Sequence, residues 1–257
     1  MQTWLEEIVP FLPYALLVLL RISVMMASLP APLGAGAPTQ IRVALSVLLT
    51  LAVCTPHWGT APMIALEVVP LARGALGELL VGAVIGLTVR VTLAAAEVAG
   101  NLLGLSMGQG FASSVDPTFG ESSMPAGRAL GGLAVLIWFV LNGHHAMLAA
   151  LAWSVEHAPP PDALMGIAHR GTVEIGAGLL AQGLRIASPV VGTMFIVQLG
   201  MGLIARSAPR VQIFALTFAI TSAVGAVVLY VSLPSLTAAI VAHIRELPTA
   251  LRIALGG

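Results

Sequence analysis

The chain has 257 residues, of which 58% are hydrophobic and only 9% charged, and its mean hydropathy is +0.99. Soluble domains carry about 25% charged residues, so this composition predicts an integral membrane protein or the core of a larger apolar assembly. The formal net charge is zero, all eleven basic residues are arginine and none form a run, which argues against nucleic-acid binding. The single cysteine, Cys54, excludes an intramolecular disulfide and a thiolate metal cluster.

The first half of the chain contains three apolar segments. A membrane-spanning helix needs roughly 20 residues. The segments are predicted at residues 10–29, 40–54 and 63–107, separated by the proline-rich break 30–38 and by a turn that ends near Trp58. The third segment is far longer than one bilayer crossing. It predicts either two spans or one long helix that leaves the membrane or bends within a complex.

The second half contains three further apolar segments after a long polar loop. They are predicted at residues 126–155, 173–204 with a kink at Pro189, and 211–233, where Pro234 marks a kink or an end before a weakly amphipathic tail. A short amphipathic stretch is expected at 164–170. The fold class is therefore predicted as an all-α membrane protein, with about six long, kinked hydrophobic helices arranged as hairpins in one domain over residues 1–257.

Glycines recur at four-residue spacing along the third segment, as in the pair Gly82 and Gly86 and the triple Gly100, Gly104 and Gly108. Small residues at this spacing let helix backbones approach closely in an apolar setting. The pattern predicts helix packing, either within the chain or against neighbouring subunits.

Three charged residues, Glu78, Arg90 and Glu97, interrupt the same apolar segment. A charge near the bilayer centre costs several kcal/mol, so these side chains must pair, meet water or lie outside the lipid. Inter-helix ion pairing in an assembly is the favoured interpretation of these buried charges. A self-contained ion or small-molecule transporter that uses the three charges is the alternative function.

Two further groups of residues invite a chemical interpretation. His144 and His145 are adjacent on a helix, where side chains point about 100° apart, so they are poorly placed to chelate one metal ion. Ser113, Ser114 and Asp116 with His144 could be drawn as a hydrolase triad, but no Gly-x-Ser-x-Gly elbow is present. The sequence therefore favours a protein that is not an enzyme, with no metal and no cofactor.

The loop within residues 100–127 is the longest polar, glycine-rich break in the chain. Asp116-Pro117 is a turn starter, and Gly108 makes the loop pliable. Phe111, Phe119 and Met124 are bulky or deformable apolar side chains, and apolar constrictions block water and ions by dewetting. The loop is thus predicted either as a connecting turn or as a stopper for a narrow conduit.

The order and spacing of several short motifs resemble one known family. They are Arg21 with Pro30, Pro38 and Arg42; Gly104-Leu-Ser-Met-Gly108 with Phe111-Ala112 and Asp116-Pro117; Met124-Pro125; Asn142-Gly-His144; and Gly202-Leu203 with Arg206, Ala208-Pro209 and Phe214. This pattern, which covers nearly the whole chain, is similar to that of the FliR/SctT family of export-gate subunits in flagellar and injectisome type III secretion. Arg210, Gln198 and Ala219 depart from that pattern, so the resemblance is weaker in the last two segments.

The resemblance implies a non-enzymatic subunit of the bacterial inner membrane, at the flagellar basal body, with much of the fold on the periplasmic side. It implies FliP-like and FliQ-like partner subunits, a FlhB-like neighbour and exported unfolded polypeptides as cargo. The loop 108–127, with Gly108, Phe111, Asp116, Pro117, Phe119 and Met124, matches the plug that fills the closed channel.

Overall fold

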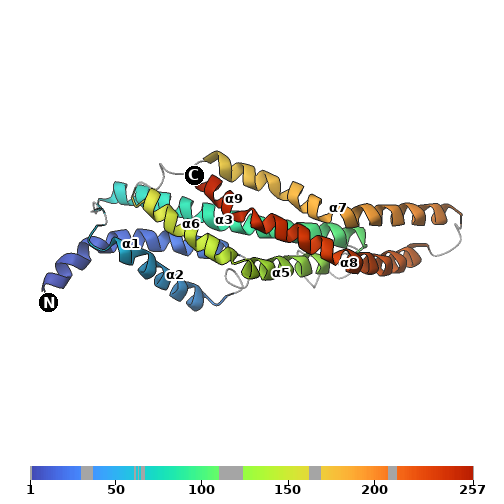
Figure 1. The fold of residues 1–257 in the computed structure, drawn as a ribbon, viewed down its shortest axis with the longest axis horizontal. Coiled ribbons are helices and arrows are strands. Elements are labelled where there is room, and N and C mark those ends of the chain that lie inside the picture. Colours follow the sequence, from blue (N-terminus) through green and yellow to red (C-terminus); the bar gives the residue numbers. More distant parts are fainter. Residues whose placement is uncertain are drawn as a thin grey trace. The chain divides into compact units, whose positions relative to one another are not determined.

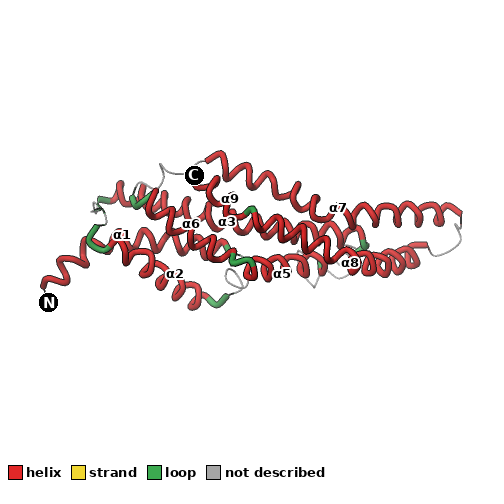
Figure 2. Tube along the Cα trace, in the orientation of Figure 1, coloured by secondary structure: helices red, strands yellow, loops and turns green. Residues whose placement is uncertain are grey.

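Every regular element in the part of the chain that the structure describes is a helix (Figures 1 and 2). The computed structural model describes residues 2–29, 37–60, 62, 64, 67–109, 124–161, 169–207 and 213–256. The helices are α1 Gln2–Ser28, α2 Thr39–Cys54, α3 Val68–Ser106, α5 Pro125–Val140, α6 Gly143–His157, α7 His169–Ser207, α8 Ile213–Arg245 and α9 Leu247–Leu255, with a 3-10 turn at Thr55–His57. The predicted all-α fold class is confirmed.

Five apolar stretches within the described residues are long enough to cross a membrane. They are Phe11–Ser28, Thr39–His57, Val68–Ser106, Ala181–Leu203 and Ala219–Leu255, and α5 with α6 together form a sixth candidate if the pair counts as one broken span. This result matches the expectation of about six long hydrophobic helices.

The third helix is continuous, which decides between the two predictions for the third apolar segment. α3 has 39 residues, equivalent to about 58 Å at 1.5 Å per residue and roughly twice the thickness of a bilayer's hydrocarbon core. α7 likewise runs through Pro189, and α8 continues through Pro234 to Arg245. Proline removes one backbone hydrogen bond but does not end either helix.

The helix predicted over residues 126–155 is wrong in its continuity, because the structure divides it into α5 and α6. Asn142 lies between them with φ 55°, in the left-handed region. A right-handed helix cannot propagate through this conformation, which asparagine tolerates better than most residues. The backbone N–H of His145 bonds to the Asn142 carbonyl at 2.9 Å and starts α6.

The helices form two compact units, each assembled from separate stretches of the chain. The first unit comprises Met1–Val91, Asn142–Gly176 and Glu246–Gly257, and the second comprises Thr92–Leu141 and Ala177–Arg245. α3 therefore contributes its first part to one unit and its last part to the other. The single domain expected over residues 1–257 stays a prediction.

Each unit has its own apolar core. In the first unit the core gathers Tyr14, Val18, Ile22 and Met25 of α1, Ile85 and Val89 of α3, Leu151 and Val155 of α6, and Leu247 and Leu251 of α9. In the second unit it gathers Ala99 and Leu103 of α3, Met107 directly after α3, Leu130 and Ala134 of α5, Val190 and Met194 of α7, and Leu236 and Ile240 of α8. Most of these positions are three or four residues apart on their helix, which is the spacing of one buried face.

The helix α2 packs on α1 with its small polar side chains inward, the reverse of a soluble helix. Its buried residues are Ser46, Thr50 and Cys54, and the hydroxyls of Ser46 and Thr50 donate to the carbonyls four residues earlier. Its exposed large side chains are Ile41, Val43, Val47, Leu48 and Leu51. Small residues at the helix contact and large apolar residues outside are typical of helices packed within a membrane.

Candidate functional site

The predicted plug loop begins at a glycine-terminated helix end. The N–H of Gly108 bonds to the Leu105 carbonyl at 3.1 Å, and the N–H of Gln109 bonds to the Gly104 carbonyl at 2.8 Å. Gly108 has φ 81°, which lies in the left-handed region that favours glycine. This pattern is the Schellman motif, so the sequence fixes where α3 ends and the loop starts.

The far end of the loop is hydrogen-bonded to two amide side chains, one on α3 and one in the turn that follows α3. The Oδ1 atom of Asn101 accepts a hydrogen bond from the Met124 N–H at 3.0 Å. The Oε1 atom of Gln109 accepts one from the Ala126 N–H at 3.3 Å. Pro125 has no N–H and occupies the first position of α5, so these two bonds satisfy N–H groups that the start of a helix leaves unpaired. We call Asn101, Gln109 and the Met124 and Ala126 N–H groups the loop base.

The glycines of the second unit allow the two ends of the loop to meet. A Cβ atom at Gly104 would lie 2.7 Å from Gln109 Oε1 and 2.8 Å from Met124 Sδ. A Cβ atom at Gly100 would collide with the backbone carbonyl of Ala126. The structure thus places Gly100 and Gly104, two of the predicted packing glycines, at contacts within the chain where α3 and α5 come together.

The last carbonyl of α3 and the carbonyl that follows it accept hydrogen bonds from side chains of two other helices. Gln198 of α7 donates through Nε2 to the Ser106 carbonyl at 2.7 Å, and Ser222 of α8 donates through Oγ to the Met107 carbonyl at 3.2 Å. A Cβ atom at Gly225 would lie 2.5 Å from Met107 Cγ, so α8 also packs closely on this end of α3. The point from which the loop leaves is therefore fixed by three helices of the second unit.

Of the predicted plug residues, Met124 contributes its N–H group to the loop base, and Gly108 ends α3 one residue before Gln109. Met124 precedes α5, and its side chain packs against Gly104. Phe111, Asp116, Pro117 and Phe119 lie outside the described residues. The amides Asn101 and Gln109 were not among the predicted site residues, although two amide side chains beside a long loop in so apolar a chain are a visible signal.

One of the three predicted buried charges forms an ion pair inside the first unit. Glu78 is fully buried, and its two carboxylate oxygens accept from Arg21 Nε at 2.6 Å and Arg21 Nη2 at 3.0 Å. Arg21 also donates to Ser154 Oγ at 2.9 Å and to the Ala158 carbonyl at 2.7 Å. One guanidinium thereby joins α1, α3, the end of α6 and the residue that follows it.

The other two predicted buried charges lie differently. Arg90 is exposed on α3 within this chain, and Glu97 is half-buried, so the burial of these two charges in an assembly stays a prediction. Neither forms an ion pair with another described residue. Glu97 lies beside Gly131 of α5, where a Cβ atom would be 3.3 Å from Glu97 Cβ.

Gly82 and Gly86 lie beside the buried ion pair, where α3 crosses α1. A Cβ atom at Gly82 would collide with the Arg21 carbonyl, and one at Gly86 would lie 2.6 Å from Ser28 Cβ and 2.8 Å from the Met25 carbonyl. The close backbone approach at these glycines brings Arg21 within reach of Glu78, one turn earlier on α3. The two glycines and the ion pair thus belong to the same contact between α1 and α3.

The two adjacent histidines lie at the start of α6. Their ring centroids are 4.2 Å apart with the planes inclined by 50°. Among the residues that the structure describes, no group of three or more His, Cys, Asp or Glu side chains is arranged to hold a metal ion. The other residues of the hydrolase triad considered above lie outside the described ranges; they are Ser113, Ser114 and Asp116.

Residues 12–247 match the model of a family described as bacterial export proteins, family 1. The chain belongs to this family. It is 29% identical over 240 residues to flagellar biosynthetic protein FliR of Pectobacterium carotovorum subsp. carotovorum, which covers 91% of this chain and 87% of the relative. It is 27% identical over 213 residues to FliR of Escherichia coli (strain K12), which covers 80% and 79%.

The chain is also similar to a protein with a different name. Yop proteins translocation protein T of Yersinia pestis is 27% identical to this chain over 158 residues, which cover 60% of each protein. The resemblance to the FliR/SctT family, inferred from short motifs, is thereby confirmed. The helical spans and the family together make the chain a membrane-embedded subunit of a type III export apparatus.

Proposed function

We propose that the chain is a non-enzymatic subunit of the type III export gate in the bacterial inner membrane, and that its loop 108–127 plugs the channel. The loop base is the observation that supports the plug most directly. Asn101 and Gln109 hold the two ends of the loop together, while side chains of α7 and α8 fix the end of α3. A stopper must be anchored firmly at its root to return to the same place after cargo has passed.

The dimensions of the helices support an assembly that extends beyond the lipid. α3 and α7 each have 39 residues and α8 has 33, so all three exceed the roughly 20 residues that one crossing requires. In an 18-residue apolar window of the span Ala219–Leu255, only 17% of the residues are buried within the chain. Such surfaces suit FliP-like and FliQ-like partner subunits, a FlhB-like neighbour and a position that reaches the periplasmic side of the basal body.

The transporter alternative has less support in the geometry of its three charges. Glu78 is occupied by two hydrogen bonds from Arg21, so its carboxylate is closed to a transported ion. Arg90 is exposed, and Glu97 is half-buried beside Gly131. A transport site needs a charged group that the transported ion can reach, and the buried, paired carboxylate of Glu78 does not offer one.

The plug is tested by removing its body while keeping its base. Residues 110–123 are replaced by a short Gly-Ser linker in cells that carry the complete apparatus, so that Asn101, Gln109 and Met124 remain. We expect a dissipated membrane potential and slower growth, because the open conduit passes ions. Normal potential together with normal secretion would rule out the plug. Loss of secretion on deletion of the whole gene, restored by the intact chain, tests the export role separately.

A further inference from the structure

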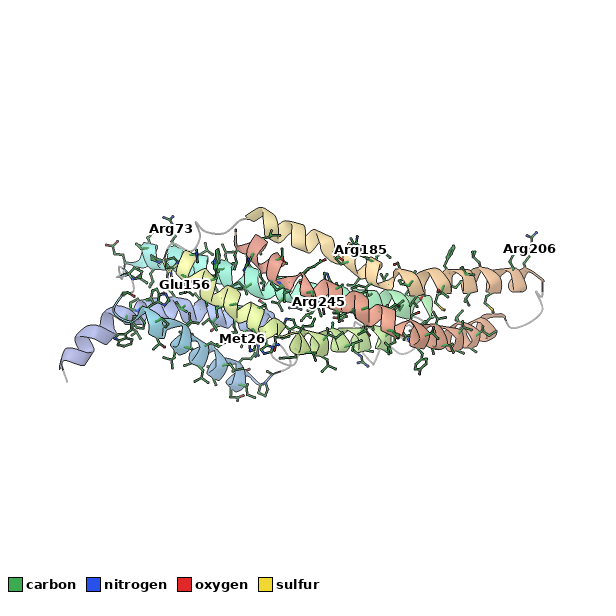
Figure 3. The ribbon with its side chains drawn as sticks, viewed as in Figure 1. Met26, Arg73, Glu156, Arg185, Arg206 and Arg245 are labelled. Atoms are coloured by element: carbon green, nitrogen blue, oxygen red, sulfur yellow. The ribbon has the colours of Figure 1, made fainter. Side chains whose placement is uncertain are left out.

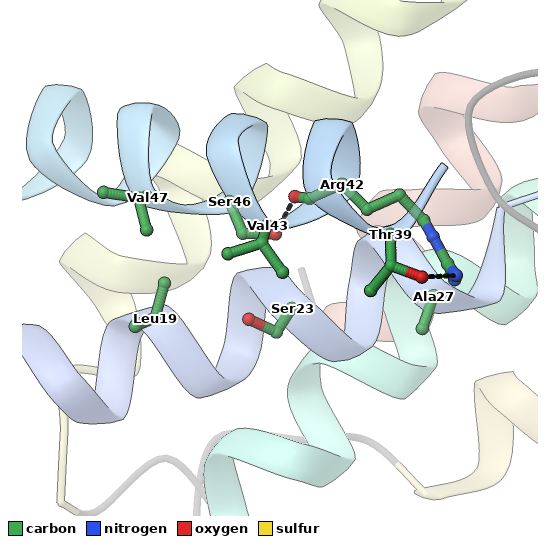
Figure 4. A pocket seen from close by; sticks show the side chains of 8 residues that line it. All are labelled: Leu19, Ser23, Ala27, Thr39, Arg42, Val43, Ser46 and Val47. Atoms are coloured by element: carbon green, nitrogen blue, oxygen red, sulfur yellow. Dashed lines mark hydrogen bonds between the residues drawn. The ribbon is translucent and has the colours of Figure 1, made fainter. Parts of the chain in front are cut away.

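A groove of about 230 Å³ lies between α1 and α2 in the first unit (Figure 4). It is lined by Leu19, Ser23, Ala27, Thr39, Arg42, Val43, Ser46 and Val47, all of them described residues. Its character changes along its length, since Leu19 and Val47 form one end and Thr39 and Arg42 form the other. The groove therefore offers an apolar wall that leads to a cation.

Arg42 lacks a partner for most of its donors. Its Nη2 atom makes one long hydrogen bond of 3.5 Å to Thr39 Oγ1, and its Nε atom is buried without a hydrogen-bond partner. No described carboxylate pairs with it, in contrast to Arg21, which is paired with Glu78. A guanidinium presents its N–H groups as a planar fork that matches phosphate oxygens, so Arg42 is suited to an anionic group entering the groove.

The place of Arg42 along α2 suits the headgroup level of a membrane. It lies in the first turn of α2, and Trp58 follows the other end of the helix, roughly 20–25 Å away at 1.5 Å per residue. That distance approaches the thickness of a bilayer's hydrocarbon core, and tryptophan favours the membrane interface. The side chains of Leu48 and Leu51, each 62% exposed, lie between these two ends and suit lipid chains.

We propose that this groove binds an anionic phospholipid, with the phosphate on Arg42 and an acyl chain along Leu19, Val43 and Val47. The Ser23 hydroxyl lies between the two ends, makes no hydrogen bond to another described residue and is available to an ester carbonyl. A free phosphate would use only the Arg42 end and leave the apolar wall empty. A zwitterionic headgroup carries its own cation, which competes with Arg42 for the phosphate.

The test measures lipid binding to the full chain by native mass spectrometry in detergent. The probes are phosphatidylglycerol, phosphatidylcholine with the same acyl chains, and inorganic phosphate. We expect phosphatidylglycerol to bind most tightly and Arg42→Gln to weaken it roughly five- to tenfold. Val43→Phe, which fills the groove at a side chain that is 56% exposed, is expected to weaken both lipids.

The matched control is Arg73→Gln, because Arg73 is exposed on α3 in the same unit and does not line the groove (Figure 3). It should leave the preference for phosphatidylglycerol unchanged. Equal binding of the two lipids, equal losses in Arg42→Gln and Arg73→Gln, or phosphate binding as tightly as the lipid would each overturn the proposal.

A photoreactive phosphatidylglycerol with a diazirine in its acyl chain supplies a second measurement that does not depend on affinity. Cross-links on the α1 and α2 peptides that contain Leu19 and Val47 are expected. Labelling confined to other exposed helices would contradict the assignment. In the assembled gate, loss of these cross-links on α1 and α2 would show that a neighbouring protein occupies the groove. That result would also overturn the assignment of the groove to a lipid. Neither result bears on whether the chain serves export.

Discussion

At the scale of single residues, the Arg21 guanidinium determines how the helices of the first unit meet. A buried charge is costly unless it is paired and its remaining donors are bonded. Arg21 uses four of its five N–H groups in this way, two to Glu78, one to Ser154 and one to the Ala158 carbonyl. The pair is therefore a device for placing α1, α3 and α6, and its net contribution to stability is smaller than the cost of breaking it.

The first prediction concerns removal of one partner. Glu78→Gln leaves the Arg21 charge buried without its counter-ion, which should lower the free energy of unfolding by about 3–5 kcal/mol. The apolar double variant Arg21→Met with Glu78→Leu should cost less than either single change, because no charge is left buried. Thermal unfolding of the purified chain in detergent measures both, and Arg73→Gln is the exposed control. A double variant less stable than both single variants would contradict this account.

The second prediction concerns Asn101 in the loop base. Asn101→Ala removes the acceptor of the Met124 N–H and should destabilise the start of α5 by about 1 kcal/mol. Asn101→Asp retains an acceptor at the same place and should preserve the bond. Hydrogen exchange at the Met124 amide reports the bond directly, and faster exchange in the alanine variant alone is the expected result. If both variants exchange at the parent rate, Asn101 does not hold the loop.

At the scale of elements, the crossing of α1 and α3 depends on the absence of a side chain at Gly82. A methyl group there would collide with the Arg21 carbonyl, which is backbone and cannot rotate away. The third prediction is that Gly82→Ala forces the helices apart and costs about 1–3 kcal/mol, with loss of the Arg21–Glu78 pair. Gly132→Ala in α5 is the control, because nothing lies within 4 Å of its Cβ position.

The control variant Gly132→Ala should not lower the stability of the protein. Alanine favours a helix interior over glycine by about 1 kcal/mol, so Gly132→Ala should be neutral or stabilising. Thermal unfolding of the two variants side by side separates the steric effect from helix propensity. Equal effects of the two substitutions would show that close approach at Gly82 is unimportant.

The helices of this chain are predictable from the sequence where they depend on residues that are close together along the chain. Continuous apolar runs located the spans, and the glycine spacing at Gly82 and Gly100 indicated close packing. Hydrophobic patterning does not predict the break at Asn142, because Asn142 and Gly143 interrupt an apolar run without any charge or proline. A left-handed residue inside a run leaves little trace in hydrophobic periodicity.

The partners in the site were not predictable, because they are distant in sequence. Arg21 is hydrogen-bonded to Glu78 and Ser154, which are 57 and 133 residues away in the sequence. Gln198 is hydrogen-bonded to the Ser106 carbonyl, which is 92 residues away. The sequence indicates that a buried charge needs a partner, but the choice among Arg90, Arg73 and Arg21 depends on which helices pack together. Tertiary packing makes that choice.

At the scale of the whole molecule, α7 presents an apolar face with no partner among the described residues of its unit. Its exposed large side chains include Leu184, Phe195, Ile196 and Leu199, and only 28% of the residues in an 18-residue apolar window of Ala181–Leu203 are buried. Gly192 and Gly200 lie on this helix, with nothing within 4 Å of their Cβ positions. Lipid tails would cover such a face without any need for glycine, whereas a neighbouring helix gains from the close approach that glycine allows.

The last prediction separates these two coverings. Gly192→Leu and Gly200→Leu keep the face apolar and meet no atom of the chain, so the lone protein should insert normally and unfold at or above the parent temperature. If a partner subunit packs there, the added side chains hold it away, and less partner should co-purify from cells that express the whole apparatus. Gly132→Leu, at an equally open position on α5, is the matched control and should retain the partners. Unchanged co-purification of all three variants would assign the α7 face to lipid, because a fluid lipid chain accommodates a leucine that a packed helix cannot.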